Sequence, residues 1–399
     1  MTGLPTRLLM GSGPSTVPDR VLTAMAQPTL GHLDPAFLAL AEDANALLRS
    51  AFRTANPTTF SVSGTGSAGM ETMIANFLEP GDRLVVGVCG LFGERIVDAA
   101  QRLGVCVSRV DAPWGEPVDY ARLEPLVGAG TRALAVVHGE TSTGVAQPLE
   151  GLAELAHDHD ALFMVDCVTS LGGHPLEIDD AGVDVAFSAT QKCLNCPPGL
   201  APMTLSDRAL ERLAARRTRV ASWCFDLPAI LEYWDSRTRV YHHTPPINSI
   251  YALHEALMLV LETGLETRWR EHAAASAALL VGLEPLGARG LVRAEHRLWP
   301  LTTVVPPPEV DEAAIRHELL ERHGMEIAGG LGALAGRAWR IGTMGVNASL
   351  KSVTAVVEAI ATALGESSSA VADACESALE TWSATIRAAD PHPAGQGAP

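Results

Sequence analysis

One lysine in this sequence stands out because lysine is almost absent from it. The chain of 399 residues carries 29 basic residues, and only Lys192 and Lys351 among them are lysines. A guanidinium stays protonated and is no nucleophile, whereas a lysine amine can attack a carbonyl carbon and form an imine. A lysine that persists where arginine is otherwise used is therefore a candidate for imine chemistry. For Lys351, which opens an amphipathic C-terminal segment, chance is the better explanation.

The surroundings of Lys192 favour a chemical role. Asp166 lies at the end of an apolar run, and Lys192 follows it by 26 positions. A carboxylate can keep a pyridine nitrogen protonated, so that the ring accepts electrons from a substrate carbanion, while a lysine binds an aldehyde at the opposite end of the ring. Alone, Asp166 would be a strand-end or capping carboxylate. The pair predicts pyridoxal 5'-phosphate, held as a Schiff base on Lys192, which also moves the α-proton of the substrate.

Two further motifs could bind anions. The turn 63–68 (Ser-Gly-Thr-Gly-Ser-Ala) joins a predicted strand to a predicted helix, where glycines and free N–H groups make a cradle for phosphate. It lacks the Gly-Lys-Ser/Thr ending of a nucleotide-binding loop, and many such turns bind nothing. Arg340 lies in a short apolar run and could hold a substrate carboxylate through both arms of its guanidinium. An internal salt bridge is the alternative for Arg340.

The elements that would position these residues follow a regular order. Short apolar runs alternate with helical patterns between about 60 and 205, which predicts an α/β fold with a mainly parallel sheet covered by helices on both faces. Strands are expected at 59–63, 84–88, 105–110, 133–138 and 162–167, with helices near 70–78, 92–103, 119–127 and 149–157. After about 263 the pattern changes to helices at 266–283, 311–323 and 350–364 and strands at 301–305 and 339–342.

This change suggests four parts. We expect an N-terminal arm (1–14), a large cofactor-binding domain (15–262), a smaller α+β C-terminal domain (263–365), and an appended helix with a loose tail (366–399). The appended helix should span about 368–388.

Composition excludes several classes of partner. The net charge of −17 disfavours nucleic acid and anionic membrane surfaces. No signal peptide and no apolar run of 18 residues is found, and seven scattered cysteines are typical of reduced thiols, so we expect a cytoplasmic protein. The pair Cys193 and Cys196 has metal-site or redox spacing, but no second pair follows it, and we predict no metal.

Several motifs in the same order resemble one known family. The chain is similar to the alanine/serine–glyoxylate aminotransferase group of the class V, fold-type I pyridoxal-phosphate enzymes, from residue 11 to about 365. The matching blocks are Gly11–Ser15, Ser63–Gly66, His138–Gly144, Asp166 with Ser170–Gly173, Gln191–Lys192 with Pro197–Gly199, Tyr241–Thr244 and Arg340–Gly342.

The resemblance implies a set of cofactor-binding residues. Thr65, Gly66 and Ser67 match the turn that cradles the phosphate, and Gln191 matches a further phosphate ligand. Phe92 falls where relatives place an aromatic residue, often tryptophan, on the pyridine ring, and Thr141 falls near the 3-hydroxyl group of the ring. Asp166 and Lys192 match the partner of the ring nitrogen and the Schiff-base lysine.

The resemblance also implies residues that serve the substrate and the neighbouring subunit. Arg340 matches the clamp for the substrate carboxylate, and Ser170 is a second candidate substrate-binding residue. Tyr241 and Thr244 match residues that reach the cofactor phosphate of the other subunit, which implies an obligate homodimer. His32 lies where the family varies.

The function implied is ping-pong transamination. An amino group would pass from a small amino acid, alanine or serine, to a 2-oxo acid, glyoxylate or pyruvate. Pyridoxamine–pyruvate transamination and a cysteine-desulfurase-like lyase remain alternatives on the same scaffold, although a desulfurase needs a reactive late cysteine and none lies between Cys224 and Cys375. A non-catalytic binding homologue is disfavoured by the intact set of Lys192, Asp166 and Arg340.

Overall fold

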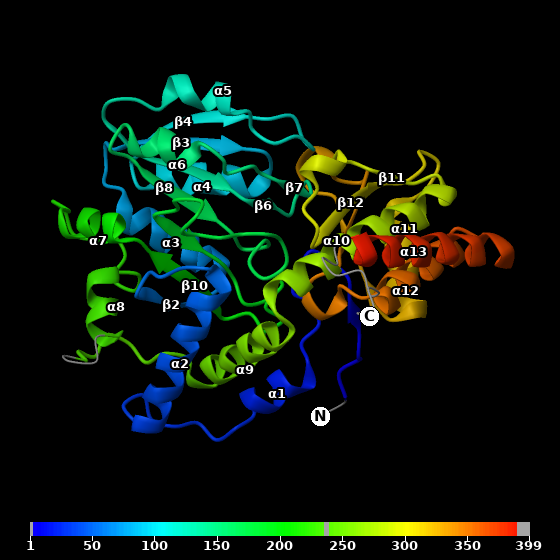
Figure 1. Cartoon of the computed structure of the whole chain (residues 1–399), viewed down its shortest axis with the longest axis horizontal. Helices are drawn as coiled ribbons and strands as arrows, with labels where there is room; N and C mark the ends of the chain where they lie inside the picture. Colours follow the sequence, from blue (N-terminus) through cyan, green and yellow to red (C-terminus); the bar gives the residue numbers. More distant parts are fainter. Residues whose placement is uncertain (1–2, 235–238, 389–399) are drawn as a thin grey trace, which may run out of the picture.

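A seven-stranded sheet forms the centre of the larger part of the molecule (Figure 1). The computed structural model describes residues 3–234 and 239–388. In spatial order the strands are β2 (Thr58–Ser63), β10 (Leu200–Leu205), β9 (Val185–Phe187), β8 (Leu162–Asp166), β5 (Thr131–Val137), β3 (Arg83–Val88) and β4 (Cys106–Asp111). Only β10 runs antiparallel to its neighbours, so the predicted mainly parallel α/β sheet is confirmed.

Helices cover both faces of this sheet because its strands are apolar on both sides. In β3, Leu84 and Val86 pack on one face and Val85 on the other, as the two-residue period of a strand requires. The helices packed on the Leu84 face are α3 (Gly66–Phe77), α4 (Leu91–Arg102), α7 (Asp207–Ala214) and α8 (Leu227–Trp234). Those packed on the Val85 face are α1 (Asp19–Met25), α2 (Pro35–Phe52), α6 (Leu152–His157) and α9 (Ile247–Thr263). The short α5 (Tyr120–Leu123) follows β4.

A second, antiparallel sheet organises the C-terminal part of the chain, residues 265–388. It contains β11 (Arg289–Gly290), β12 (Leu301–Val305), β15 (Trp339–Gly342) and β14 (Ala328–Gly329). The helices of this part are α10 (Leu265–Leu283), α11 (Glu312–His323), α12 (Leu350–Ala363) and α13 (Ser368–Ala388). The N-terminal strand β1 (Leu8–Leu9) pairs with β13 (Met325–Glu326), so the N-terminal segment packs on the C-terminal part.

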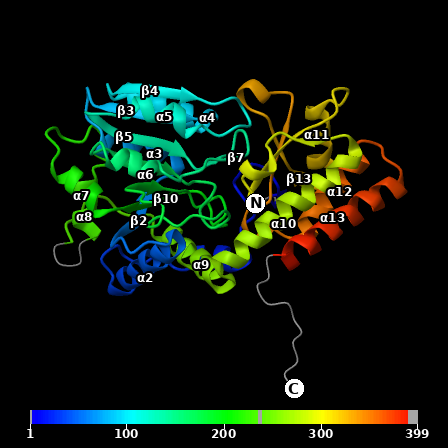
Figure 2. The same cartoon turned by 45° about the horizontal axis from the view of Figure 1, so that its top comes forward.

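The appended helix is present where the sequence predicts it. Both views place α13 beside α10 and α12 (Figures 1 and 2). Ala374 and Ala378 are fully buried on its inner face, close to Gly282 of α10. The predicted loose tail, residues 389–399, lies outside the described residues.

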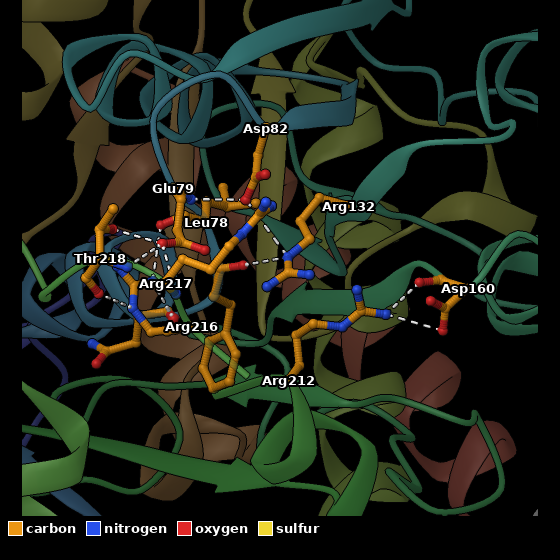
Figure 3. A network of polar contacts seen from close by, with 11 residues as sticks. Leu78, Glu79, Asp82, Arg132, Asp160, Arg212, Arg216, Arg217 and Thr218 are labelled. Carbon is orange, nitrogen blue, oxygen red and sulfur yellow. Dashed lines mark hydrogen bonds and ion pairs between the residues drawn. The ribbon is translucent and has the colours of Figure 1, made fainter. Parts of the chain in front are cut away.

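A polar network fixes the loop between α7 and α8 to the end of α3 (Figure 3). The carboxylate of Glu79 accepts hydrogen bonds from Arg217 N at 3.1 Å and from Thr218 N at 2.7 Å and Thr218 Oγ1 at 2.6 Å. The hydroxyl of Thr218 is the main cause that lowers the pKa of Glu79. The same loop carries Trp223, whose ring stacks on His242 with centroids 4.3 Å apart, so the network also supports the segment around residue 242.

Candidate active site

Lys192 is enclosed by the N-terminal segment. Its side chain lies in the connection between β9 and β10, is only 8% exposed, and donates a hydrogen bond to the carbonyl of Ser12. Gly13 has a positive φ of 99°, and a Cβ atom there would lie 2.5 Å from Lys192 Nζ, so any other residue would strain the backbone and displace the lysine side chain. Burial is the main cause that lowers the pKa of Lys192 to about 8. A larger fraction of the amine is therefore unprotonated and nucleophilic at neutral pH than in free lysine.

Asp166 ends β8 and keeps one oxygen available. It is 4% exposed, and its Oδ1 accepts a hydrogen bond from Val168 N at 2.9 Å. Among the described residues no donor bonds its second oxygen. Burial raises the pKa of Asp166 to about 7, and Glu140 adds to the rise, whereas Lys192 opposes it. A cationic N–H group placed against this carboxylate would favour its ionised form.

The start of α3 lies against the segments that carry Asp166 and Lys192. A Cβ atom on Gly66 would lie 3.2 Å from a methyl group of Val168 and 3.1 Å from Cβ of Ala189, so a bulkier residue would push the turn away. The N-cap residue Thr65 makes no capping hydrogen bond with its side chain. Ala68 N donates to the carbonyl of Thr65 at 2.8 Å, whereas no acceptor among the described residues bonds the N–H groups of Gly66 and Ser67. These two N–H groups therefore stay available, and the positive end of the helix dipole favours an anion there.

Phe92 is held by a network that the sequence analysis missed. Glu140, fully buried, accepts hydrogen bonds from Phe92 N at 3.0 Å and Gly93 N at 3.3 Å, while Ser142 Oγ accepts one from Leu91 N at 2.9 Å. These contacts fix the first turn of α4 and with it the Phe92 ring. Glu140 precedes Thr141 in the block 138–144. A carboxylate directly before a predicted site residue was the feature of the sequence that could have indicated this role.

Arg340 makes no salt bridge with residues 3–234 and 239–388, although the charge of Glu140 acts on it, so the described contacts do not support the internal salt bridge considered from the sequence. Its guanidinium is buried on β15 and donates from Nε to the carbonyl of Gly329 at 2.8 Å and from Nη1 to that of Thr141 at 3.1 Å. No ion pair forms between Arg340 and the described carboxylates. Arg340 interacts electrostatically with Lys192, whose pKa it helps to lower, so the two cations share one neighbourhood.

Tyr241 and Thr244, which the resemblance assigned to the neighbouring subunit's site, lie on the surface of the chain. Tyr241 is 57% exposed, and its hydroxyl lies 3.2 Å from Thr244 Oγ1. The neighbouring His243 Nε2 lies 3.0 Å from Ser63 Oγ, which places this segment next to the turn that leads into α3. The ring of His32 is 5.2 Å from that of Tyr241.

Two other candidates have unpaired oxygen atoms. Ser170 is fully buried, and its Oγ has no hydrogen-bond partner among the described residues. Gln191 Oε1 is likewise buried without such a partner. Because unpaired buried polar atoms cost about 1–3 kcal/mol each, they point to groups that a ligand or water can satisfy.

These residues fit pyridoxal phosphate. The buried amine of lowered pKa suits the aldehyde of the cofactor, and the buried carboxylate with one free oxygen suits its ring nitrogen. The helix start with free N–H groups suits its phosphate. Cys193 and Cys196 are buried free thiols, and the described residues contain no cluster of histidine, cysteine and carboxylate side chains able to hold a metal ion.

Comparison with known proteins decides the family. The model of the family described as Aminotransferase class-V matches residues 7–352. The chain belongs to the class V aminotransferases. The class V alanine–glyoxylate aminotransferase of Callithrix jacchus is 40% identical over 368 residues, which are 90% of this chain and 88% of the relative.

Solved structures agree with this assignment. An alanine–glyoxylate aminotransferase from Nostoc sp. is 48% identical and superposes with a TM-score of 0.89, over 91% of this class V aminotransferase and 96% of the other chain. A pyridoxamine–pyruvate aminotransferase from Mesorhizobium loti is 27% identical, with a TM-score of 0.88 over 96% and 98% of the two chains.

The family defines the chemistry in general terms. This class V aminotransferase is an enzyme that uses pyridoxal phosphate and catalyses transamination between an amino acid and a 2-oxo acid. In the described parts of the chain, no helix combines the length and apolar character needed to cross a membrane.

Proposed function

We propose that this enzyme transfers the amino group of alanine or serine to glyoxylate or pyruvate. The observation that carries the proposal is Arg340, a buried guanidinium near Lys192 that forms no ion pair with the described residues, although the charge of Glu140 acts on it. Such a group binds one substrate carboxylate, which suits a monocarboxylic amino acid. The alanine–glyoxylate aminotransferases among the relatives support the same pair of substrates.

The cofactor is assigned to the residues that fit its functional groups. We assign Lys192 to its attachment, Asp166 to the ring nitrogen, Phe92 to the ring face and Thr141 to the ring hydroxyl. The phosphate is assigned to Gln191 and to the start of α3, at Thr65, Gly66 and Ser67. When bound, pyridoxal phosphate supplies an electron sink for the pair of electrons left when the substrate loses its α-proton.

The chain itself contributes three actions. Arg340 holds the substrate carboxylate and so orients the Cα–H bond. Lys192, whose lowered pKa keeps part of it neutral, would take the proton from the substrate Cα and pass it to the cofactor, and would move a proton back to the Cα of the second substrate in the reverse half-reaction. Residues 12–15 cover Lys192, with Ser15 Oγ bonded to its carbonyl at 2.7 Å, and limit the access of water. The second 2-oxo acid completes the ping-pong cycle by the same steps in reverse order.

Replacing Arg340 tests the proposed specificity. We expect Arg340→Lys to lower kcat/KM for alanine by about 10- to 100-fold, because a hydrogen bond to a charged group contributes about 1.5–3 kcal/mol. The exposed Arg322→Lys is the matched control and should leave kcat/KM unchanged. Equal kcat/KM values for Arg340→Lys and the wild type would contradict the clamp.

A second candidate is transamination between pyridoxamine and pyruvate, because a neighbour with this activity covers 96% of the chain. Purified enzyme given pyridoxamine and pyruvate, without alanine, distinguishes the two functions. Production of alanine and pyridoxal at rates above those of alanine with glyoxylate would favour this alternative.

We also propose a homodimer in which Tyr241 and Thr244 serve the active site of the other subunit. Support comes from their exposure together with that of Val240 and Trp223, since exposed aromatic and apolar side chains gather at interfaces.

All seven cysteines are free thiols, which supports a cytoplasmic location. We also propose that the parts of the chain are divided after residues 14, 262 and 365, as the sequence pattern predicts.

A further inference from the structure

Asn195 is a buried amide in the loop that carries Lys192. It follows Lys192 by three positions and is 3% exposed. Its backbone φ is 53°, in the left-handed region that asparagine adopts more readily than most residues with a Cβ atom. Asn195 N donates a hydrogen bond to the carbonyl of Lys192 at 3.0 Å. The turn therefore holds the amide in a fixed position beside the lysine, although none of the roles assigned above uses it.

The amide nitrogen binds two segments that are distant in the sequence. Nδ2 of Asn195 donates to Ser15 Oγ and to the carbonyl of Thr16, at 3.1 Å each. It also donates to the carbonyl of Met344 at 3.2 Å. Because an amide carries two hydrogens, these three acceptors share them. The reverse orientation of the amide would set its oxygen against two carbonyl oxygens, so the contacts fix Nδ2 as the donor.

The amide oxygen binds the turn after β15. Asn195 Oδ1 accepts a hydrogen bond from Val346 N at 2.9 Å. Gly345 has a φ of 60°, and a Cβ atom there would overlap the amide, so this turn packs directly on Asn195. Gly345 N also donates to Nε2 of the buried His272 on α10 at 2.8 Å. The turn is therefore held by the loop after Lys192 and by α10.

The segments that Asn195 joins belong to the proposed active site. The N-terminal segment encloses the Lys192 amine, which donates to the carbonyl of Ser12. The turn follows β15, which carries Arg340. The two segments also contact each other, since Gly342 N donates to the carbonyl of Met10 at 2.8 Å. One side chain therefore connects the segment that covers the amine with the strand that carries the guanidinium.

We propose that Asn195 is a positioning residue, which holds residues 12–16 closed over Lys192 and keeps the strand of Arg340 in place beside it. Its N–H groups supply the bonds to both segments, and its oxygen supplies the bond to the turn. Without these bonds, water gains access to Lys192, and Arg340 moves relative to it. The roles of Lys192 and Arg340 rest on the proposed function, whereas the closure of residues 12–16 rests on contacts within the chain.

Hydrogen–deuterium exchange of the full-length enzyme, loaded with pyridoxal phosphate, measures this closure. We expect Asn195→Gly, which permits the same backbone conformation, to speed exchange in residues 9–16 about tenfold, because the hydrogen bonds of the amide are lost. Asn195→Asp keeps the oxygen without the N–H groups and should have the same effect. Ser15 N, which donates to the carbonyl of Gln191 at 2.9 Å, lies in the reporting segment. Exchange in β8 should stay as in the wild type.

The Michaelis constant separates positioning from a general loss of stability. Both variants should raise KM for alanine about tenfold, because the guanidinium that binds the substrate carboxylate is displaced. A smaller fraction of folded enzyme would instead lower the apparent kcat alone. Asp160→Gly is the matched control, because Asp160 is exposed and also has a positive φ, of 55°. It should leave both the exchange of residues 9–16 and KM unchanged.

Two exchange results would overturn the proposal. One is exchange in residues 9–16 at the wild-type rate in folded variants, and the other is equal acceleration in β8 and in residues 9–16, which reflects global unfolding. An unchanged KM in both variants would overturn the positioning of Arg340. If exchange changes as expected while the wild type transaminates neither alanine nor serine, the proposed function fails and the closure by Asn195 stands.

Discussion

At the scale of single residues, the central feature is a pair of buried titratable groups with opposite shifts. Burial lowers the pKa of Lys192 to about 8 and raises that of Asp166 to about 7. Each shift disfavours the charged form, so the enzyme without its cofactor holds two groups in costly environments. The proposed function gives both shifts a use, since an unprotonated amine and a carboxylate that responds to a ring N–H are the groups that transamination needs.

The Asp166 shift predicts how the stability of the cofactor-free enzyme depends on pH. Its folded-state pKa is above the usual 3.8, so its favourable contribution is complete below pH 3.8 and is lost as the pH rises through 7. Asp166→Asn removes this loss. The unfolding free energy of the variant minus that of the wild type should therefore rise by about 2–3 kcal/mol from pH 5 to pH 8, at about 1.4 kcal/mol per pKa unit.

Urea unfolding of both apoproteins at the two pH values measures this gain. The same variant should lose transaminase activity, because an amide cannot keep the ring nitrogen protonated. An apoprotein whose stability difference from wild type is constant over this range would contradict a buried Asp166 with a raised pKa.

At the scale of elements, periodicity predicted the segments whose apolar residues face one layer. The strands at 301–305 and 339–342 and the helix at 368–388 agree with β12, β15 and α13 to the residue. The sequence analysis predicted no element between 206 and 262, although the 17-residue helix α9 occupies Ile247–Thr263. Its N-cap residue Pro246 makes no side-chain capping bond, so the start of α9 lacks the usual sequence signal.

Contacts between distant segments were beyond sequence analysis. The two-residue strand β1 has too few residues for a pattern, and its pairing with β13 spans most of the chain. The packing of Gly13 on Lys192 and the bonds of Glu140 to α4 are likewise tertiary, so only the residue types could be noted. Lys192, Asp166 and Arg340 were found because their chemistry is rare or specific, whereas positioning residues such as Glu140 have no such mark.

The packing of α13 gives a prediction about stability. We expect Ala378→Asp to lower the free energy of unfolding by a few kcal/mol, because it would bury an unpaired charge against α10. Ala372→Asp on the exposed face of the same helix is the matched control and should change it by less than about 0.5 kcal/mol. Thermal unfolding of the two variants provides the comparison; similar melting temperatures would show that α13 contributes little.

At the scale of the whole molecule, the proposed active site draws on both sheets. Lys192 and Asp166 come from the larger part, whereas Arg340 comes from β15 of the C-terminal part and reaches across to Thr141. The site therefore depends on how these two parts pack. In the proposed dimer it depends on the neighbouring subunit as well.

Mixing two defective variants tests the shared site. Lys192→Ala should be inactive, and the combination of Tyr241→Phe with Thr244→Ala should be weakly active. After the two are mixed, unfolded and refolded together, roughly a quarter of wild-type activity should return, because half of the dimers are mixed and each has one intact site. No return of activity in mixtures that form dimers would contradict the cross-subunit roles of Tyr241 and Thr244.

The most direct test of the account is to locate the cofactor on the chain. We would load the enzyme with pyridoxal phosphate, reduce it with borohydride to fix any imine, and map the modified peptide by mass spectrometry. Lys351→Ala, which replaces the other lysine of the chain, serves as the matched control. The account predicts modification of Lys192 in the wild type and in Lys351→Ala, and no modification and no transamination in Lys192→Ala. Modification of Lys351, or undiminished transamination by Lys192→Ala, would contradict it.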